Sequence, residues 1–262
     1  MPKRPSRTFA VFSLCAALAL TTLALTYRAS QWVPPFYEQL QRAEPVGLAS
    51  FGDEFERELL ELHNAWEASG QWSGIFTDEQ INGWLAMDMQ EKFPILLPTT
   101  VKDPRIAIKD SQAHLACQYV NGGVSAVLSM VVDVSLTERP NEVALRLRTA
   151  RIGAVPGLMR QAMQKISVAA IRSGIPIYWK QIESDPVAIV RIPAGVFELG
   201  KSLVIESLEL TDGRLAVAGR VNPLEEDSQV QQQSAESRPD ATELPGHTEP
   251  PGQASRQDNR HF

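Results

Sequence analysis

The chain has 262 residues, of which 44% are hydrophobic and 21% charged, and its formal net charge is −6. This size and composition suit one globular domain with a proper core and exclude a wholly disordered or fibrous protein. The acidic balance argues against nucleic-acid binding, because a surface that binds phosphates normally leaves a basic excess.

Residues 8–27 contain no charged side chain and lie between Arg7 and Arg28. A helix of that length crosses a hydrocarbon core about 30 Å thick at about 1.5 Å per residue. A cleaved signal peptide is the alternative interpretation, but Ala17 and Ala19, which resemble a cleavage pattern, lie inside the apolar run. The sequence therefore favours a retained transmembrane helix at residues 8–27.

The charges that flank this helix predict its orientation. Lys3, Arg4 and Arg7 make residues 1–7 basic, whereas the flank after the helix mixes basic and acidic side chains. Basic flanks stay on the cytoplasmic side of a membrane. We therefore expect residues 1–7 in the cytoplasm and the rest of the chain outside the cell inner (cytoplasmic) membrane, in the periplasm.

Two helices are expected after a proline-containing linker at residues 28–50. In residues 51–66 the apolar side chains recur at spacings of three and four, which puts them on one helical face. The second helix begins after Thr77, which can cap it, and Gln80 occupies the capping-box position. It should end at about Lys92, because a proline follows shortly after.

From Val101 onward the apolar residues recur with a period of two, which is typical of strands. Residues 124–136 give the clearest strand, since every even position is apolar and one face could cover a core. Turn signals bound this strand and its neighbours: Asp110-Ser111, Asn121-Gly122-Gly123 and Pro140-Asn141.

A third helix is expected at residues 157–173. Strands return at residues 187–192 and 203–221, the latter a hairpin around Thr211-Asp212-Gly213. Residues 223–262 hold eight acids and three bases and have no apolar period, so we expect a disordered acidic tail.

Together these patterns predict an α+β fold, with an N-terminal transmembrane helix followed by a curved, mainly antiparallel sheet packed against two or three helices. The extracytoplasmic domain should cover residues 51–222. No second domain is needed at this length.

Three short motifs carry a resemblance to a known family. They are Thr77-Asp78-Glu79-Gln80-Ile81-Asn82, Arg151-Ile152-Gly153-Ala154-Val155-Pro156 and Ile175-Pro176-Ile177. With the anchor, they make roughly residues 76–221 resemble the YpmS-like family of uncharacterised single-pass bacterial envelope proteins. The resemblance implies a layout similar to elongated lipid-binding modules, in which a curved sheet wraps a long helix and leaves an apolar groove. It implies no catalytic residue, and the acidic tail and the helix at residues 51–66 depart from the family pattern.

The sequence offers little for catalysis. The four histidines, His63, His114, His247 and His261, are scattered and form no zinc motif. No nucleophile elbow and no phosphate-binding glycine loop is present in the sequence. We therefore expect a protein that is not an enzyme, with no catalytic residue, no metal and no cofactor.

An apolar ligand is the one kind of ligand for which the sequence offers candidates. The even face of residues 124–136 could line a groove together with tryptophan and methionine side chains from the helices and the following strand. Core packing is the alternative role for the same side chains. The candidate ligand-binding residues are Trp84, Leu128, Met130, Val132, Met159, Met163 and Trp179.

Three function classes fit these features. The sequence favours a membrane-anchored, non-catalytic scaffold or assembly factor that holds other envelope proteins through the helix at residues 51–66 and the acidic tail. A lipid or apolar-ligand binding module at the outer face of the inner membrane is the alternative, and an enzyme is the third class. An open groove on the even face of residues 124–136 would favour lipid binding, whereas a filled core would favour the scaffold.

Overall fold

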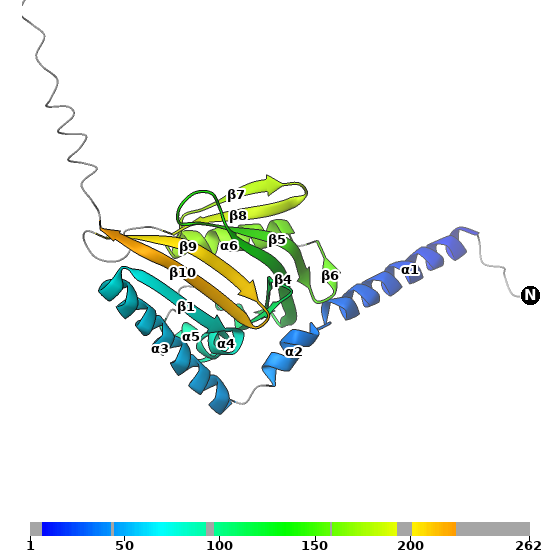
Figure 1. Ribbon diagram of the computed structural model, residues 1–262. Coiled ribbons are helices and arrows are strands. Elements are labelled where there is room, and N and C mark those ends of the chain that lie inside the picture. Colours follow the sequence, from blue (N-terminus) through cyan, green and yellow to red (C-terminus); the bar gives the residue numbers. More distant parts are fainter. Residues whose placement is uncertain (1–6, 43–44, 93–96, 158, 193–200, 224–262) are drawn as a thin grey trace, which may run out of the picture. The chain divides into compact units, whose positions relative to one another are not determined.

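The computed structural model describes residues 7–42, 45–92, 97–157, 159–192 and 201–223. In this part of the chain every strand pairing is antiparallel, so the predicted α+β fold with an antiparallel sheet is confirmed (Figure 1). The curvature of the sheet stays a prediction. Residues 1–6 and 224–262, which include nearly all of the predicted tail, lie outside the described residues.

Five helices follow the N-terminal helix in the described ranges, rather than the two or three predicted. One of them, α2, lies in the predicted linker, and the predicted second helix is divided at Asp88 into α4 and α5. The helices are α1 (Arg7–Ser30), α2 (Pro35–Gln41), α3 (Pro45–Ser69), α4 (Asp78–Met87), α5 (Met89–Lys92) and α6 (Met159–Arg172).

The strands form two sheets, with the orders β1-β10-β9 and β2-β3-β4-β5-β8-β7, and β6 pairs with β5 at the side of the larger sheet. Their bounds are β1 (Gln71–Thr77), β2 (Val101–Lys109), β3 (Gln112–Asn121), β4 (Val124–Leu136), β5 (Glu142–Ile152), β6 (Val155–Pro156), β7 (Ile177–Ile182), β8 (Asp185–Arg191), β9 (Lys201–Thr211) and β10 (Arg214–Pro223). Short turns join most neighbouring strands, as the glycine and asparagine signals predict.

The three-stranded sheet packs on one end of the seven-stranded sheet. A cluster of Ile108 from β2, Ala113 from β3 and Leu210 from β9 is buried between them. On the other side of the small sheet, α3 runs along β1 (Figure 1), and its Phe55 ring lies 5.3 Å from Phe76 and 5.7 Å from Trp84. Phe55 of α3 is therefore used inside the domain, whereas Phe51 and Leu59 on the same predicted apolar face are exposed.

The opposite face of the large sheet is covered by α2. Tyr37 is completely buried there against Ala116 and Val127, and its hydroxyl donates to the carbonyl oxygen of Asp103 at 2.9 Å. Burial of the Tyr37 hydroxyl raises its pKa far above the ordinary value. Helix α2 thus covers this face of β3 and β4 near the end where α1 meets the domain.

Helix α1 contains Val11–Ser30, which by length and composition could cross a membrane. The hydroxyls of Thr21, Thr22 and Thr26 each donate to a carbonyl oxygen four residues earlier, at 2.8 Å, so these polar groups are satisfied within the helix. At its C-terminal end the helix meets the domain, where the Ala154 N–H donates to the Ala29 carbonyl at 2.8 Å.

Candidate functional site

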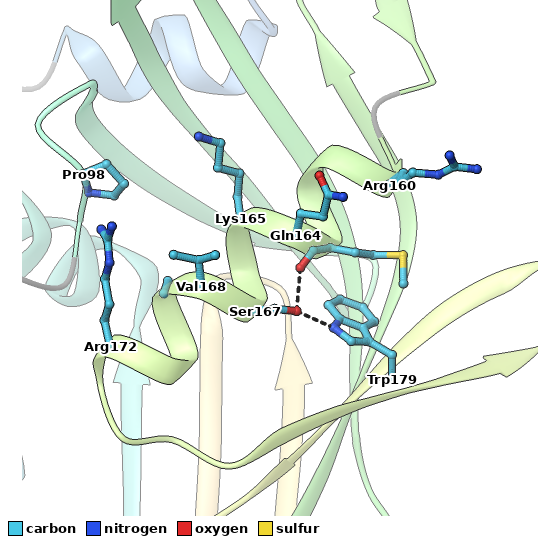
Figure 2. Close-up of a pocket in the computed structure, with 10 residues that line it drawn as sticks. Pro98, Arg160, Gln164, Lys165, Ser167, Val168, Arg172 and Trp179 are labelled. Carbon is cyan, nitrogen blue, oxygen red and sulfur yellow. Dashed lines mark hydrogen bonds between the residues drawn. The ribbon is translucent and has the colours of Figure 1, made fainter.

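Helix α6 lies against the large sheet, where it contacts β5 and β7. The indole N–H of Trp179 in β7 donates to the Ser167 hydroxyl at 2.8 Å, and that hydroxyl donates to the Met163 carbonyl at 2.8 Å (Figure 2). Gly174, with a φ of +67°, ends the helix. These contacts hold the helix at a defined position beside the sheet.

A cavity of about 270 Å³ lies between α6 and strands β3, β4 and β5; we call it the sheet cavity. Its strand side is formed mainly by apolar side chains, and its helix side by one flank of α6. The cavity is lined, among others, by Tyr119, Leu128, Met130, Ala150, Arg151 and Ile152 from the strands and by Ala162, Lys165 and Ile166 from the helix. Its size is close to the lower end for small-molecule sites.

A second cavity, of about 730 Å³, lies along the other flank of α6; we call it the flank cavity. Figure 2 shows Lys165 and Arg172 pointing from the helix toward the side where Pro98 lies, with Arg160 near the other end of the helix. Trp179 and Met163 line the same cavity. Lys165 borders both cavities.

The even face of β4 divides into an open half and a filled half. Leu128 and Met130 are half-buried and border the sheet cavity. Two residues further on, Val132 is only 4% exposed, and Val134 packs on the cluster around Leu210. The division follows from the covering elements, because the three-stranded sheet covers the second half, whereas α6 covers the first half without filling it.

The structure brings together some of the predicted ligand-binding residues and separates others. Leu128 and Met130 share the sheet cavity, and Met163 and Trp179 share the flank cavity. Val132 belongs to the filled core. Trp84 packs against Phe55 at the α3–α4 contact. Met159, in the first turn of α6, borders neither cavity.

The sequence analysis did not identify several residues that line the sheet cavity. Some of them belong to an apolar pattern in the sequence, and others do not. Ile166 stands on the predicted apolar side of the third helix, and Ile152 belongs to a strand that alternates with polar neighbours, so both had an apolar signal. Arg151 and Lys165 look like ordinary surface residues in the sequence. The crossing of α6 over β5 brings Lys165 to the cavity, whereas Arg151, paired with Ser129, points its side chain to the opposite face of the sheet.

The charged side chains at the two cavities are all basic. Lys165 borders the sheet cavity, and Arg160, Lys165 and Arg172 border the flank cavity, whereas no Asp or Glu among the described residues lines either one. Arg151 also borders the sheet cavity, but it is paired with Ser129, so its side chain points to the opposite face of the sheet. None of these four side chains forms an ion pair with another residue in the part of the chain that the structure describes. The described lining of the cavities therefore combines apolar side chains with basic residues that have no ion-pair partner among the described residues.

Arginines elsewhere on the same sheet behave differently. Arg146 and Arg148 both contact the carboxylate of Asp185 at 2.8 Å, and Arg191 contacts Glu142 at 2.7 Å. The hydrogen bond from Arg191 holds the pKa of the Glu142 carboxyl below its usual range. Carboxylates thus neutralise these arginines, whereas the basic residues near α6, like the exposed Lys102 and Lys109 of β2, have no ion pair among the described residues.

Reactive groups are scarce around the cavities. Cys117 lies opposite Leu128 in the sheet, and burial raises the pKa of its thiol to about 11, which keeps it in the unreactive protonated form. No group of three or more His, Cys, Asp or Glu side chains that could hold a metal ion occurs among the described residues.

Comparison with known proteins adds no relative: no family model matches the chain, and neither a curated protein nor a solved structure matches it. The resemblance to the YpmS-like family stays a prediction from the sequence motifs.

Proposed function

We propose that the protein is a lipid-binding module, held by α1 at the outer face of the inner membrane, and that the sheet cavity receives an acyl chain. One observation carries this proposal: Leu128 and Met130 border a space of about 270 Å³ together with Ile152 and Ile166, instead of being packed into a filled core. Apolar walls around an open cavity favour an apolar ligand, because filling the cavity removes their surface from water.

The contacts at the end of α1 support its retention as an anchor. The Ala29 carbonyl accepts the Ala154 N–H, and the side-chain amide of Gln31 donates to the Ser125 carbonyl at 3.2 Å. Cleavage near Ser30 would remove the first of these partners from the domain. The basic residues that precede the helix in the sequence favour a cytoplasmic N-terminus and an extracytoplasmic domain.

The scaffold role receives less support from the geometry. It depends on the helix at residues 51–66 as a surface for partners, but that segment belongs to α3, whose Phe55 packs on Phe76 and Trp84. An amphipathic helix already packed on its own domain offers a partner mainly its polar side. Partner binding by α3 would then need contacts other than its main apolar face.

A cavity-filling substitution tests lipid binding. In Ala162→Phe the new ring would occupy the sheet cavity, because Ala162 faces it from α6. Ala169→Phe is the matched control, since Ala169 lies two turns further along the helix and borders the flank cavity only. The full chain is purified from membranes in an amphipathic polymer, and the bound species are measured by native mass spectrometry.

We expect a co-purifying lipid in the wild-type protein and in Ala169→Phe, and its loss in Ala162→Phe at an unchanged melting temperature. Lipid that persists in a folded Ala162→Phe variant would place the ligand elsewhere and refute the proposed site. Absence of lipid from all three proteins would refute the proposed function and favour the scaffold.

A further inference from the structure

We infer that the turn between β3 and β4 contacts the headgroup region of the outer leaflet beside the end of α1, with Val120 and Val124 against the lipid. Residues 120–124 are called the hairpin tip below. The partner of this surface is the bilayer itself. The inference rests on the anchoring helix of the proposed function and adds a second contact between the domain and the membrane.

The end of α1 lies against two turns of the large sheet. The side-chain amide of Gln31 donates to the Ser125 carbonyl at 3.2 Å, and Ser125 directly follows the hairpin tip. A Cβ at Gly153, in the turn between β5 and β6, would overlap backbone atoms of Ala29 and Ser30. Both turns are therefore close to the point where the helix would leave the membrane.

These two turns are also uncharged. Among the turns that join consecutive strands directly in the described ranges, only the β3–β4 and β5–β6 turns contain no Asp, Glu, Lys or Arg; the others carry Asp110, Glu138 with Arg139, Glu183 and Asp212. The charge-free stretch around the hairpin tip is long, since residues 111–132 contain none of these four residue types. Because a charged side chain is unfavourable in lipid, this distribution favours contact of the two uncharged turns with the bilayer.

The hairpin tip exposes an apolar side chain on each face of the sheet. Val120 is 39% exposed and Val124 is 61% exposed. Val124 is paired with Asn121, the residue after Val120, so the two valines point to opposite faces. Contact with lipid would remove both side chains from water, which is favourable.

The backbone of the turn sets the depth of this contact. Gly122 and Gly123 both have positive φ values, so the turn is tight and presents no side chain of its own. Backbone groups of a turn that lack a strand partner need water, which the hydrocarbon core does not supply. The hairpin tip therefore belongs at the boundary between headgroups and acyl chains rather than deeper in the bilayer.

Aromatic side chains at the same end of α1 agree with a membrane boundary there. Tyr27 and Trp32 are exposed, and both lie within four residues of Gln31, whose side chain contacts the strand next to the hairpin tip. Tyrosine and tryptophan are enriched where a helix passes from hydrocarbon to water. The helix and the hairpin thus give consistent indications of where the bilayer surface lies.

The same hairpin leads to the sheet cavity. Tyr119 precedes the hairpin tip in β3 and Leu128 follows it in β4, and both line the cavity. Leu128 follows Val124 by four residues, about 13 Å at the rise of an extended strand. An acyl chain that enters from the outer leaflet would therefore have a short path to the cavity.

The test measures the depth of the hairpin tip in the full chain, inserted in phosphatidylcholine nanodiscs. Cys15 and Cys117 are replaced by alanine, and an NBD fluorophore is attached at Val124→Cys. The matched control carries the fluorophore at Glu138→Cys, in the exposed turn at the other end of β4. The quenchers are phosphatidylcholine with a doxyl group on the acyl chain near the headgroup, which acts from the lipid, and iodide, which acts from water.

We expect the doxyl lipid to quench the fluorophore at position 124 and iodide to leave it nearly unchanged, whereas position 138 should show the reverse. Val120→Asp should abolish the lipid quenching at position 124, because a charge at the tip favours water. Ser135→Asp, at an exposed position in the distal part of β4, should leave that quenching unchanged. Iodide quenching at position 124 as strong as at position 138 would overturn the inference, and so would lipid quenching that Val120→Asp does not reduce.

Native mass spectrometry of the unlabelled wild-type protein separates this inference from the proposed function. Lipid quenching at position 124 without a co-purifying lipid would support the membrane contact and refute the lipid site in the sheet cavity. A co-purifying lipid together with iodide quenching at position 124 would support the lipid site and refute the contact. A full chain that does not enter nanodiscs would refute the anchor and, with it, both proposals.

Discussion

Asn82 forms two hydrogen bonds with the backbone of Ile106, because its Nδ2 donates to the Ile106 carbonyl at 2.7 Å and its Oδ1 accepts the Ile106 N–H at 2.8 Å. Strand β2 is the edge of the seven-stranded sheet, so its outer backbone groups have no neighbouring strand. The side-chain amide of a helix residue supplies the pairing that such a strand would otherwise provide. Asn82 is 1% exposed, so water cannot replace it.

Removing this amide should destabilise the domain. Asn82→Ala leaves a donor and an acceptor of Ile106 without partners, and each unsatisfied group costs about 1–3 kcal/mol. We expect the free energy of unfolding to fall by roughly 2–4 kcal/mol in urea titrations. Asn121→Ala, at an exposed turn, is the control and should change it by less than about 0.5 kcal/mol. Equal effects of the two substitutions would contradict this role of Asn82.

Replacing a glycine by alanine should lower the stability of the protein in α4 and raise it in α3. A Cβ at Gly83 would lie 2.8 Å from the Phe51 carbonyl carbon and closer still to backbone atoms of Leu48 and Gly52, so α3 and α4 approach each other through backbone. Gly83→Ala should therefore destabilise the protein by about 1–3 kcal/mol or more. Gly47→Ala, in α3 with open space around it, should stabilise by about 0.5–1 kcal/mol. Thermal unfolding of both variants checks the two signs.

Local signals made part of this fold predictable from the sequence. The Thr77 hydroxyl accepts the Gln80 N–H and the Gln80 side chain accepts the Thr77 N–H, as the capping-box pattern predicts, so α4 begins where expected. The hairpin at Thr211-Asp212-Gly213 likewise depends on residues adjacent in the chain. Such features require no knowledge of what lies across the molecule.

Strand β1 was not predictable in this way. Its hydrogen-bonding partner is β10, with Trp72 opposite Gly219 and Phe76 opposite Leu215, more than one hundred residues away in the chain. Ser73 and Gly74 in its middle weaken the strand pattern. The pairing that makes this segment a strand comes from tertiary structure, which a single sequence does not display.

The candidate site could likewise be predicted only in part from the sequence. Leu128 and Val132 occupy equivalent positions in an alternating pattern, yet one borders a cavity and the other is in the core. The difference lies in the covering element, which is α6 over Leu128 and the three-stranded sheet beyond it. Lys165 likewise reaches the cavity only because α6 crosses β5.

The pH dependence of stability should contain a contribution from Asp78. Burial raises the pKa of its carboxyl to about 6 from the ordinary 3.8, although the carboxylate accepts the Ile108 N–H at 3.1 Å. Since the folded-state pKa lies above the unfolded one, this contribution to stability is fully present below about pH 4 and is lost as the pH rises through about 6.

Asp78→Asn removes this titration. The melting temperature of the variant, relative to wild type, should therefore rise between about pH 4.5 and pH 7.5. Glu142 and Asp185, whose pKa values are lowered by arginine partners, act in the opposite direction but are common to both proteins, so they cancel in the difference. Asp53→Asn, at an exposed position of α3, should show no such trend. A difference that stays constant with pH would contradict the role of Asp78.

Two aspartate substitutions on β4 test whether the sheet cavity is open. Met130 and Val132 lie two residues apart on one face of the strand, so their side chains point the same way. Met130 borders the cavity, together with Leu128 and Ile152. Val132 is 4% exposed, opposite Ala113 and Leu147 in the neighbouring strands.

We expect Met130→Asp to fold with a melting temperature close to that of wild type, because the new carboxylate can keep its water in the cavity. The same carboxylate would place charge beside the acyl chain, so co-purified lipid should be lost. Val132→Asp would bury a carboxylate without a partner, which costs several kcal/mol of the roughly 5–15 kcal/mol that hold a domain together. That variant should unfold or fail to accumulate. Circular dichroism melts and native mass spectrometry of both variants test whether the cavity is open. If Met130→Asp unfolds as Val132→Asp does, the space beside Met130 is closed core. If Met130→Asp folds and keeps its lipid, the acyl chain binds elsewhere.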